Sequence, residues 1–217
     1  MRIGIISEGT TDQIVIKNII KAILEDFEWT TIKPDLQTDE TDIHLKNAAA
    51  AGGLSGVKKG CEDEVLLAGF FDQIIEDKDF LIIQIDTAEI EEFGVVRPGK
   101  KDNENYVSDL RENAIGKIKE WINNPEYDEK LVYAISIEEL EAWLLTIYEK
   151  RDSVKSMSPK ERLQRIVGKK GIDSSDENYG KLSKDFKKKK KLIGFCKNNE
   201  SLLLFVQDLE QQIESED

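Results

Sequence analysis

Acidic side chains stand directly after three short apolar segments of the chain. They are Glu8, then Asp86, then the group Glu138, Glu139 and Glu141. Carboxylates held close together repel one another, so such a cluster costs stability unless a cation offsets the repulsion. Carboxylate oxygens are ligands that Mg²⁺ and Mn²⁺ favour. If the three segments end at one place in the fold, these residues predict a site for Mg²⁺ or Mn²⁺.

The apolar segments have the character of buried strands. Residues 79–86 form a near-continuous apolar run, and shorter runs occupy 2–7 and 131–135. The segments that follow or separate these runs have apolar residues at helical spacing. The expected helices span 13–24, 62–75, 106–122 and 138–148, and Thr11 or Asp12 is the expected cap of the first. Alternation of strands and helices predicts a Rossmann-like α/β fold, with a mostly parallel sheet covered on both faces. The carboxyl ends of parallel strands share one edge, where functional residues gather.

Two stretches of the chain differ from this pattern. Residues 26–60 read as irregular, and their glycine-rich part, 48–60, is either a flexible loop or a phosphate-contacting loop; its spacing matches no nucleotide-binding fingerprint. Residues 151–200 are basic and polar, and 201–213 predict an apolar helix that packs back on the body. We therefore expect an α/β core over 1–150 and a helical, basic C-terminal extension over 151–217.

The net charge of −13 opposes a long nucleic-acid footprint, but the basic residues are clustered. Clustered lysines are able to hold a phosphate backbone. The candidates are Lys58, Lys59, Lys100, Lys101, Lys187, Lys188 and Lys189. The run of five lysines over 187–191 has two readings, a solvated helix face or a binding patch.

Several classes of protein are disfavoured by composition. Cys61 and Cys196 lack metal-ligand spacing and are expected to be buried thiols. His44 is the single histidine, which disfavours a Cys/His zinc site and an HNH-type nuclease site, and a Ser-His-Asp triad would have to use it. The apolar runs are too short to span a bilayer, and the N-terminus resembles no targeting peptide. We expect a cytoplasmic protein with no membrane contact.

Three segments together resemble the Toprim family. Residues 3–12, with Glu8-Gly-Thr-Thr-Asp12, match its first motif, and residues 81–86 match the strand of its second motif. The segment Ile137-Glu-Glu-Leu-Glu-Ala-Trp143 is similar to a part of a small stand-alone branch, often encoded beside ATPases in bacterial anti-phage systems. The family also includes nucleases of the overcoming-lysogenization-defect type.

The resemblance implies a metal site and a reaction. Asp86 would ligate Mg²⁺ or Mn²⁺, and Glu8 would act as a general acid/base or a further ligand. Glu139 and Glu141 would orient or complete the site, although Glu141 has the alternative of being a surface acid. Trp143 is expected in the core rather than as a base-stacking platform. The implied function is hydrolysis of DNA or RNA, with tRNA included, by the effector of a defence system that works with an ATPase.

Ala88 departs from the family pattern, which has a second acid two residues after Asp86. Three explanations are open: an engineered replacement of a native aspartate, use of Glu89 as the ligand instead, or a protein without catalytic activity. Two other functions are also open. One is a non-catalytic regulatory subunit of an ATPase complex, and the other is a phosphatase or nucleotidyl transferase on the same acidic scaffold. A homodimer is compatible with the sequence.

Overall fold

A four-stranded parallel sheet forms the centre of the molecule. The computed structural model describes residues 1–33, 52–72, 79–99, 103–154, 156–172 and 178–214. Within them the strand order is β2-β1-β3-β4, and every neighbouring pair is parallel. The strands are β1 (Arg2–Ile6), β2 (Glu28–Lys33), β3 (Phe80–Asp86) and β4 (Leu131–Ser136). The predicted Rossmann-like α/β fold is confirmed.

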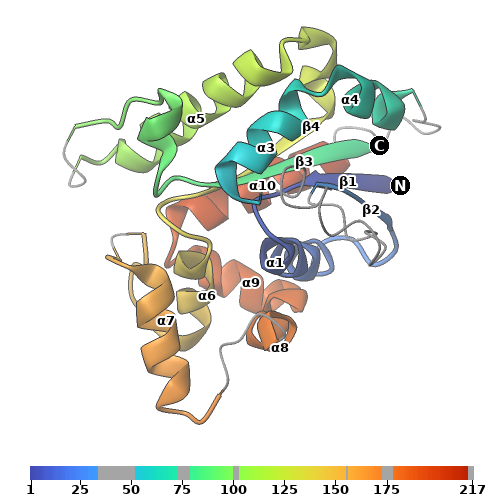
Figure 1. Ribbon diagram of the computed structural model, residues 1–217. Coiled ribbons are helices and arrows are strands. Elements are labelled where there is room, and N and C mark those ends of the chain that lie inside the picture. The colour runs from blue at the N-terminus through green and yellow to red at the C-terminus, as the bar shows by residue number, and fades with distance from the viewer. Residues whose placement is uncertain (34–51, 73–78, 100–102, 155, 173–177, 215–217) are drawn as a thin grey trace, which may run out of the picture.

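Helices cover both faces of this sheet (Figure 1). One face carries α3 (Gly53–Glu62), α4 (Glu64–Phe71) and α5 (Tyr106–Ile122). The other is covered by α1 (Thr10–Ile20) and α10 (Glu200–Glu214). Outside these two lie α6 (Glu141–Tyr148), α7 (Pro159–Gly168), α8 (Tyr179–Leu182) and α9 (Lys189–Cys196), which join the same hydrophobic cluster. Short 3₁₀ turns lie at η2 (Ile90–Phe93), η3 (Pro125–Lys130) and η5 (Lys184–Lys187). None of the helices in the described residues is both long and apolar enough to cross a membrane.

The apolar run of β3 is buried on both sides, as expected for a central parallel strand. Phe80 and Ile82 join the hydrophobic cluster under α1 and α10, whereas Leu81 and Ile83 join the cluster under α3 and α5. Side chains of a strand alternate between its two faces. The polar end of β3 therefore turns Asp86 toward the side of α1.

The expectation of irregular structure over 26–60 is wrong for the described residues. They form β2 and α3. β2 is an edge strand whose residues are mostly half-buried, so it lacks a strong apolar pattern. In α3 the apolar positions are helically spaced, but glycines obscure them. Gly60 is one of these, and a Cβ atom there would lie only 3.3 Å from Ile6 Cγ2, so the glycine allows the helix to approach β1 closely.

The expected cap of the first helix is also wrong. α1 begins at Thr10, and Gly9 occupies the cap position in an extended conformation with no side-chain cap. Asp12 lies one turn later, and its carboxylate accepts a hydrogen bond from the Gly9 backbone N–H. This is the reach-back bond of a capping box, with aspartate in place of the usual glutamate.

The helices after residue 156 pack into the same core as the sheet. Trp143 is fully buried and stacks on Phe205 of α10, with ring centroids 5.4 Å apart. Its Nε1–H donates to Ser201 Oγ at 2.8 Å, and Ser201 Oγ donates to Asn199 Oδ1 at 2.9 Å. The predicted core role of Trp143 is confirmed.

Replacing the Trp143 indole tests how much its contacts with α10 stabilise the packing of the C-terminal segment on the sheet. Trp143→Phe removes the donor to Ser201 and part of the buried area, so it should lower the free energy of unfolding by about 1–3 kcal/mol. Urea denaturation measures the loss. Ser201→Ala is the matched partner, and the double variant should lose less than the sum of the two single losses. Strictly additive losses would contradict a shared hydrogen bond.

Candidate metal centre

A hydrogen-bonded network joins the carboxyl ends of β1 and β3. The Asp86 backbone N–H donates to Glu8 Oε1 at 2.6 Å, and the Glu8 N–H donates to Gln84 Oε1 at 3.1 Å. Gln84 Nε2 in turn donates to Asp86 Oδ1 at 3.0 Å. The adjacency of β1 and β3 thus brings together the two acids for which the sequence predicted metal ligation.

Two further carboxylates complete the cluster from helix N-termini. Asp12 lies in the first turn of α1, and Glu141 is the first residue of α6. The phenol of Tyr179 in α8 donates to Glu141 Oε1 at 2.5 Å, and both side chains are buried. The Leu140 backbone N–H donates to the Asp86 carboxylate. Glu141 is therefore part of the cluster and not a surface acid.

Crowding changes the acidity of these groups. Burial and, to a smaller extent, the charge of Glu89 raise the pKa of Glu8 to about 7, although the hydrogen bond from the Asp86 N–H lowers it. Burial and then the charges of Glu8 and Glu141 raise the pKa of Asp12 to about 7. Burial, with the charges of Asp12, Glu8 and Glu141, raises the pKa of Asp86 well above its usual range. Each shift reflects first the burial of the carboxyl group and, after it, the negative charge of neighbouring carboxylates.

Within the described residues, none of the four cluster carboxylates forms an ion pair with a basic side chain. The positive charge of Lys160 lowers the pKa of Asp12, but it is the last among the causes acting on that group. Glu8, Asp12 and Asp86 each keep part of their surface open to solvent. The cluster therefore lacks an ion-pair partner among the described residues, and three of its four carboxylates are partly accessible.

The donor chemistry fits a hard divalent cation, because carboxylate oxygens suit Mg²⁺ and Mn²⁺. As the side chains stand, no three Asp, Glu, His or Cys groups of the described residues are arranged to hold one ion. Ligation would therefore require rotation of the partly exposed side chains of Glu8, Asp12 and Asp86. Asp86 and Glu8 remain the first candidates as ligands, and Asp12 and Glu141 join them.

The loop after β3 is tied to the loop after β4. Ala88 is exposed, and its backbone N–H donates to Glu138 O at 3.0 Å. The Arg97 guanidinium donates to the carbonyl oxygens of Thr87 and Ala88 and to the Glu138 carboxylate. Glu138 itself has a left-handed backbone, with φ of 64°. Arg97 is thus turned inward and holds the two loops together.

Glu139 does not join the cluster in this arrangement. Its Oε2 accepts a hydrogen bond from the backbone N–H of Lys160 at 2.9 Å, in the first turn of α7. Glu89, by contrast, lies near enough for its charge to raise the pKa of Glu8. Besides Asp86, Glu89 is therefore the acid near position 88 whose charge acts on the cluster.

The predicted basic patches are less free than the sequence indicates. Lys58 and Lys59 lie on α3 and not on a loop, and Lys58 pairs with Glu62 at 3.6 Å. Lys188 pairs with Asp185 and Lys189 with Glu210, whereas Lys187 forms no ion pair with a described residue. His44, Lys100 and Lys101 lie outside the described residues.

The lysine run also lies away from the carboxylates. α10 begins at the edge of the sheet where β3 and β4 end, and Lys189 contacts Glu210, ten residues further along α10. At 1.5 Å per residue, this contact is roughly 15 Å from that edge. Lys160 in α7 is the nearer cation, because its charge acts on Asp12, and no local pattern in the sequence marks it.

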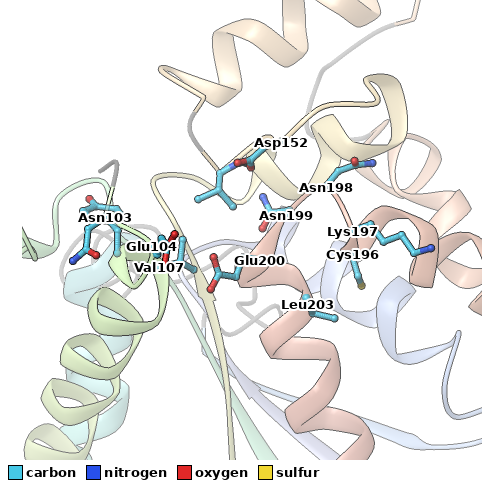
Figure 2. A pocket seen from close by; sticks show the side chains of 12 residues that line it. Asn103, Glu104, Val107, Asp152, Cys196, Lys197, Asn198, Asn199, Glu200 and Leu203 are labelled. Atoms are coloured by element: carbon cyan, nitrogen blue, oxygen red, sulfur yellow. The ribbon is translucent and has the colours of Figure 1, made fainter. Parts of the chain in front are cut away.

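A separate cavity of about 390 Å³ opens between the first turns of α5 and α10 (Figure 2). Its lining includes Glu104, Asp152, Asn199 and Glu200, and none of its residues belongs to the carboxylate cluster. Burial and then the charge of Asp152 raise the pKa of Glu200. The cavity is therefore acidic like the cluster but distinct from it.

Comparison of the chain with models of known protein families finds no match. Comparisons with curated proteins and with solved structures find none either. The resemblance to the Toprim family therefore stays a prediction that rests on its motifs.

The raised pKa values predict how stability depends on pH. A carboxyl group with a higher pKa in the folded state binds protons more tightly there, so stability is fully present below the unfolded pKa and is lost as pH rises through the folded pKa. For Glu8 and Asp12 this window runs from about pH 4 to about pH 7. One such group contributes a loss on the order of 3 kcal/mol by pH 8.

Metal-free protein should accordingly unfold at lower urea concentration at pH 8 than at pH 5. Asp12→Asn is the matched variant, since it removes one titrating group and one source of repulsion on Asp86. Its decline in stability over the same pH range should be shallower. Parallel pH profiles for the variant and the unaltered chain would contradict the clustering.

Proposed function

We propose that this protein is a Mg²⁺-dependent nuclease, which hydrolyses phosphodiester bonds at the carboxyl ends of β1 and β3. The observation that supports this most is the set of uncompensated carboxylates Glu8, Asp12, Asp86 and Glu141. A cation would offset their repulsion, and the residues' oxygen chemistry suits Mg²⁺ or Mn²⁺. When bound, such an ion polarises a phosphoryl oxygen and lowers the pKa of a water molecule.

The protein's own groups would supply orientation and proton transfer. Asp86, fixed by Gln84 and by the Leu140 N–H, is the central ligand. Glu141, held by the Tyr179 phenol, is the most buried of the four carboxylates. Glu8, whose pKa lies near 7, exchanges a proton readily at neutral pH, as a general acid/base must. Asp12 completes the ligand set in place of an acid at position 88.

The proposed identity of the substrate and of the partners is based on the resemblance to the Toprim family. Nucleic acid (DNA, RNA or tRNA) is the substrate class that it implies, and an ATPase in an anti-phage system is the implied partner. Lys160 is a candidate contact for substrate phosphate, because its charge acts on Asp12. The alternative, a regulatory subunit of an ATPase complex, would need no metal for its role.

Metal-dependent cleavage tests the proposal. The unaltered chain, Asp86→Asn and Ala88→Asp should each be incubated with plasmid DNA, single-stranded DNA and total tRNA in Mg²⁺, Mn²⁺ or EDTA. Cleavage of one substrate class should require the metal and should fall at least 100-fold in Asp86→Asn, because that change removes the central ligand. Ala88→Asp should retain or increase the rate. Gel analysis of the products measures all three.

Three results would count against a nuclease. Cleavage that survives both EDTA and Asp86→Asn would come from another source. Absence of cleavage by both the unaltered chain and Ala88→Asp would favour the regulatory subunit. Hydrolysis of small phosphate esters but not of polymers would instead point to a phosphatase.

The lysine run requires its own experiment. Changing Lys187, Lys188 and Lys189 to glutamine should flatten the dependence of nucleic-acid affinity on salt, if these residues contact the phosphate backbone. Fluorescence anisotropy across a range of salt concentrations gives the slope. The same slope measured for Lys160→Gln serves as a comparison, because Lys160 lies near the carboxylate cluster. An unchanged slope in the triple variant would assign the run to a solvated helix face.

A further inference from the structure

Ser136 carries a buried hydroxyl group that the fold leaves without a hydrogen bond. It is the last residue of β4 and has no exposed surface. Its Oγ finds no hydrogen-bond partner in the part of the chain that the structure describes. Burial of an unsatisfied hydroxyl is costly, so such a group calls for an explanation.

The position of Ser136 relates it to the carboxylate cluster. In the parallel pairing of β3 with β4, Ser136 lies directly opposite Asp86. Val132 and Ala134 of β4 join the same hydrophobic cluster as Phe80 of β3, and side chains alternate along each strand. Ser136 and Asp86 therefore lie side by side on one face of the sheet.

Asp86 retains capacity for another hydrogen bond. Its carboxylate accepts bonds from Gln84 Nε2 and from the Leu140 N–H, whereas an ionised carboxylate offers about four acceptor positions. Metal-ligating carboxylates are commonly held by a second layer of hydrogen bonds, which fix their orientation. Gln84 and Leu140 supply two such bonds, and a hydroxyl on the neighbouring strand is placed to supply a third.

We propose that Ser136 is a positioning residue of the metal centre, whose hydroxyl donates to the Asp86 carboxylate once a cation is bound there. The hydroxyl that has no partner among the described residues would then gain one in the Asp86 carboxylate. This inference rests on the proposed function, because it requires that Asp86 ligates a metal. It also explains why serine stands at a fully buried strand position where alanine would fit the same space.

Ser136→Ala separates this role from a structural one. Without metal, the variant should unfold at the same temperature as the unaltered chain or higher, because it loses only an unsatisfied hydroxyl. Its dissociation constant for Mn²⁺, from titration calorimetry, should rise roughly 10-fold or more. Ser201→Ala is the matched control, since the Ser201 hydroxyl bonds to Trp143 and Asn199. The control should unfold several degrees lower and bind Mn²⁺ as the unaltered chain does.

Three results would overturn the inference. Mn²⁺ affinity of Ser136→Ala within twofold of the unaltered chain would show that the hydroxyl does not act on the site. A fall of several degrees in the unfolding temperature of metal-free Ser136→Ala would show that the hydroxyl has a structural partner. Absence of Mn²⁺ binding by the unaltered chain itself would overturn the proposed metal centre, and this inference with it.

Discussion

Glu8, Asp12, Asp86 and Glu141 repel one another at the carboxyl ends of β1 and β3. The surrounding structure depends on how this repulsion is offset. Beside burial, the charges of Glu8 and Glu141 raise the pKa of Asp12, and the same two charges with that of Asp12 raise the pKa of Asp86. No ion pair with a described residue relieves them. The fold offsets part of this cost with backbone dipoles. Asp12 lies in the first turn of α1 and Glu141 in the first turn of α6, where the positive end of a helix stabilises an acid. Backbone N–H groups at Gly9, Asp86 and Leu140 each donate to one of the carboxylates. The repulsion that these dipoles leave would be offset by a bound cation, which would stabilise the folded protein.

The loops that carry these acids are held in place by groups outside the cluster. Arg97 binds the carbonyl oxygens after β3 and the Glu138 carboxylate after β4. The left-handed backbone at Glu138 is a conformation that non-glycine residues rarely adopt, so it needs such support. Tyr179 brings a contribution from the C-terminal segment, whose helices share a core with the sheet. The cluster therefore depends on residues spread over most of the chain.

The sequence was sufficient to predict the parts of the fold with strong local signals. The apolar runs of β1, β3 and β4 and the helical spacing of α5 led to the parallel α/β fold. β2 and α3 were missed because an edge strand needs no fully apolar face and because glycines dilute the pattern of α3. Glu8 and Asp86 follow from strand ends, which parallel pairing brings together. Tyr179 and Lys160 could not be predicted, because only packing of the C-terminal helices places them beside the acids.

Asp12 illustrates a different limit. Its position four residues after Glu8 was visible, but a polar residue at the start of a helix has an ordinary explanation as a cap. In the structure Gly9 is the cap residue, and Asp12 supports the helix terminus from the first turn, where its carboxylate accepts the Gly9 N–H while its charge acts on Asp86. A residue that stabilises a helix terminus is thereby also part of the site.

The most direct test of this account is anomalous X-ray scattering from crystals soaked in Mn²⁺. The account predicts one strong anomalous peak at the carboxyl ends of β1 and β3, within ligating distance of Asp86 and of at least one of Glu8, Asp12 and Glu141. Absence of a peak there at saturating Mn²⁺, or a peak only at another group of acids such as Glu104, Asp152 and Glu200, would contradict it.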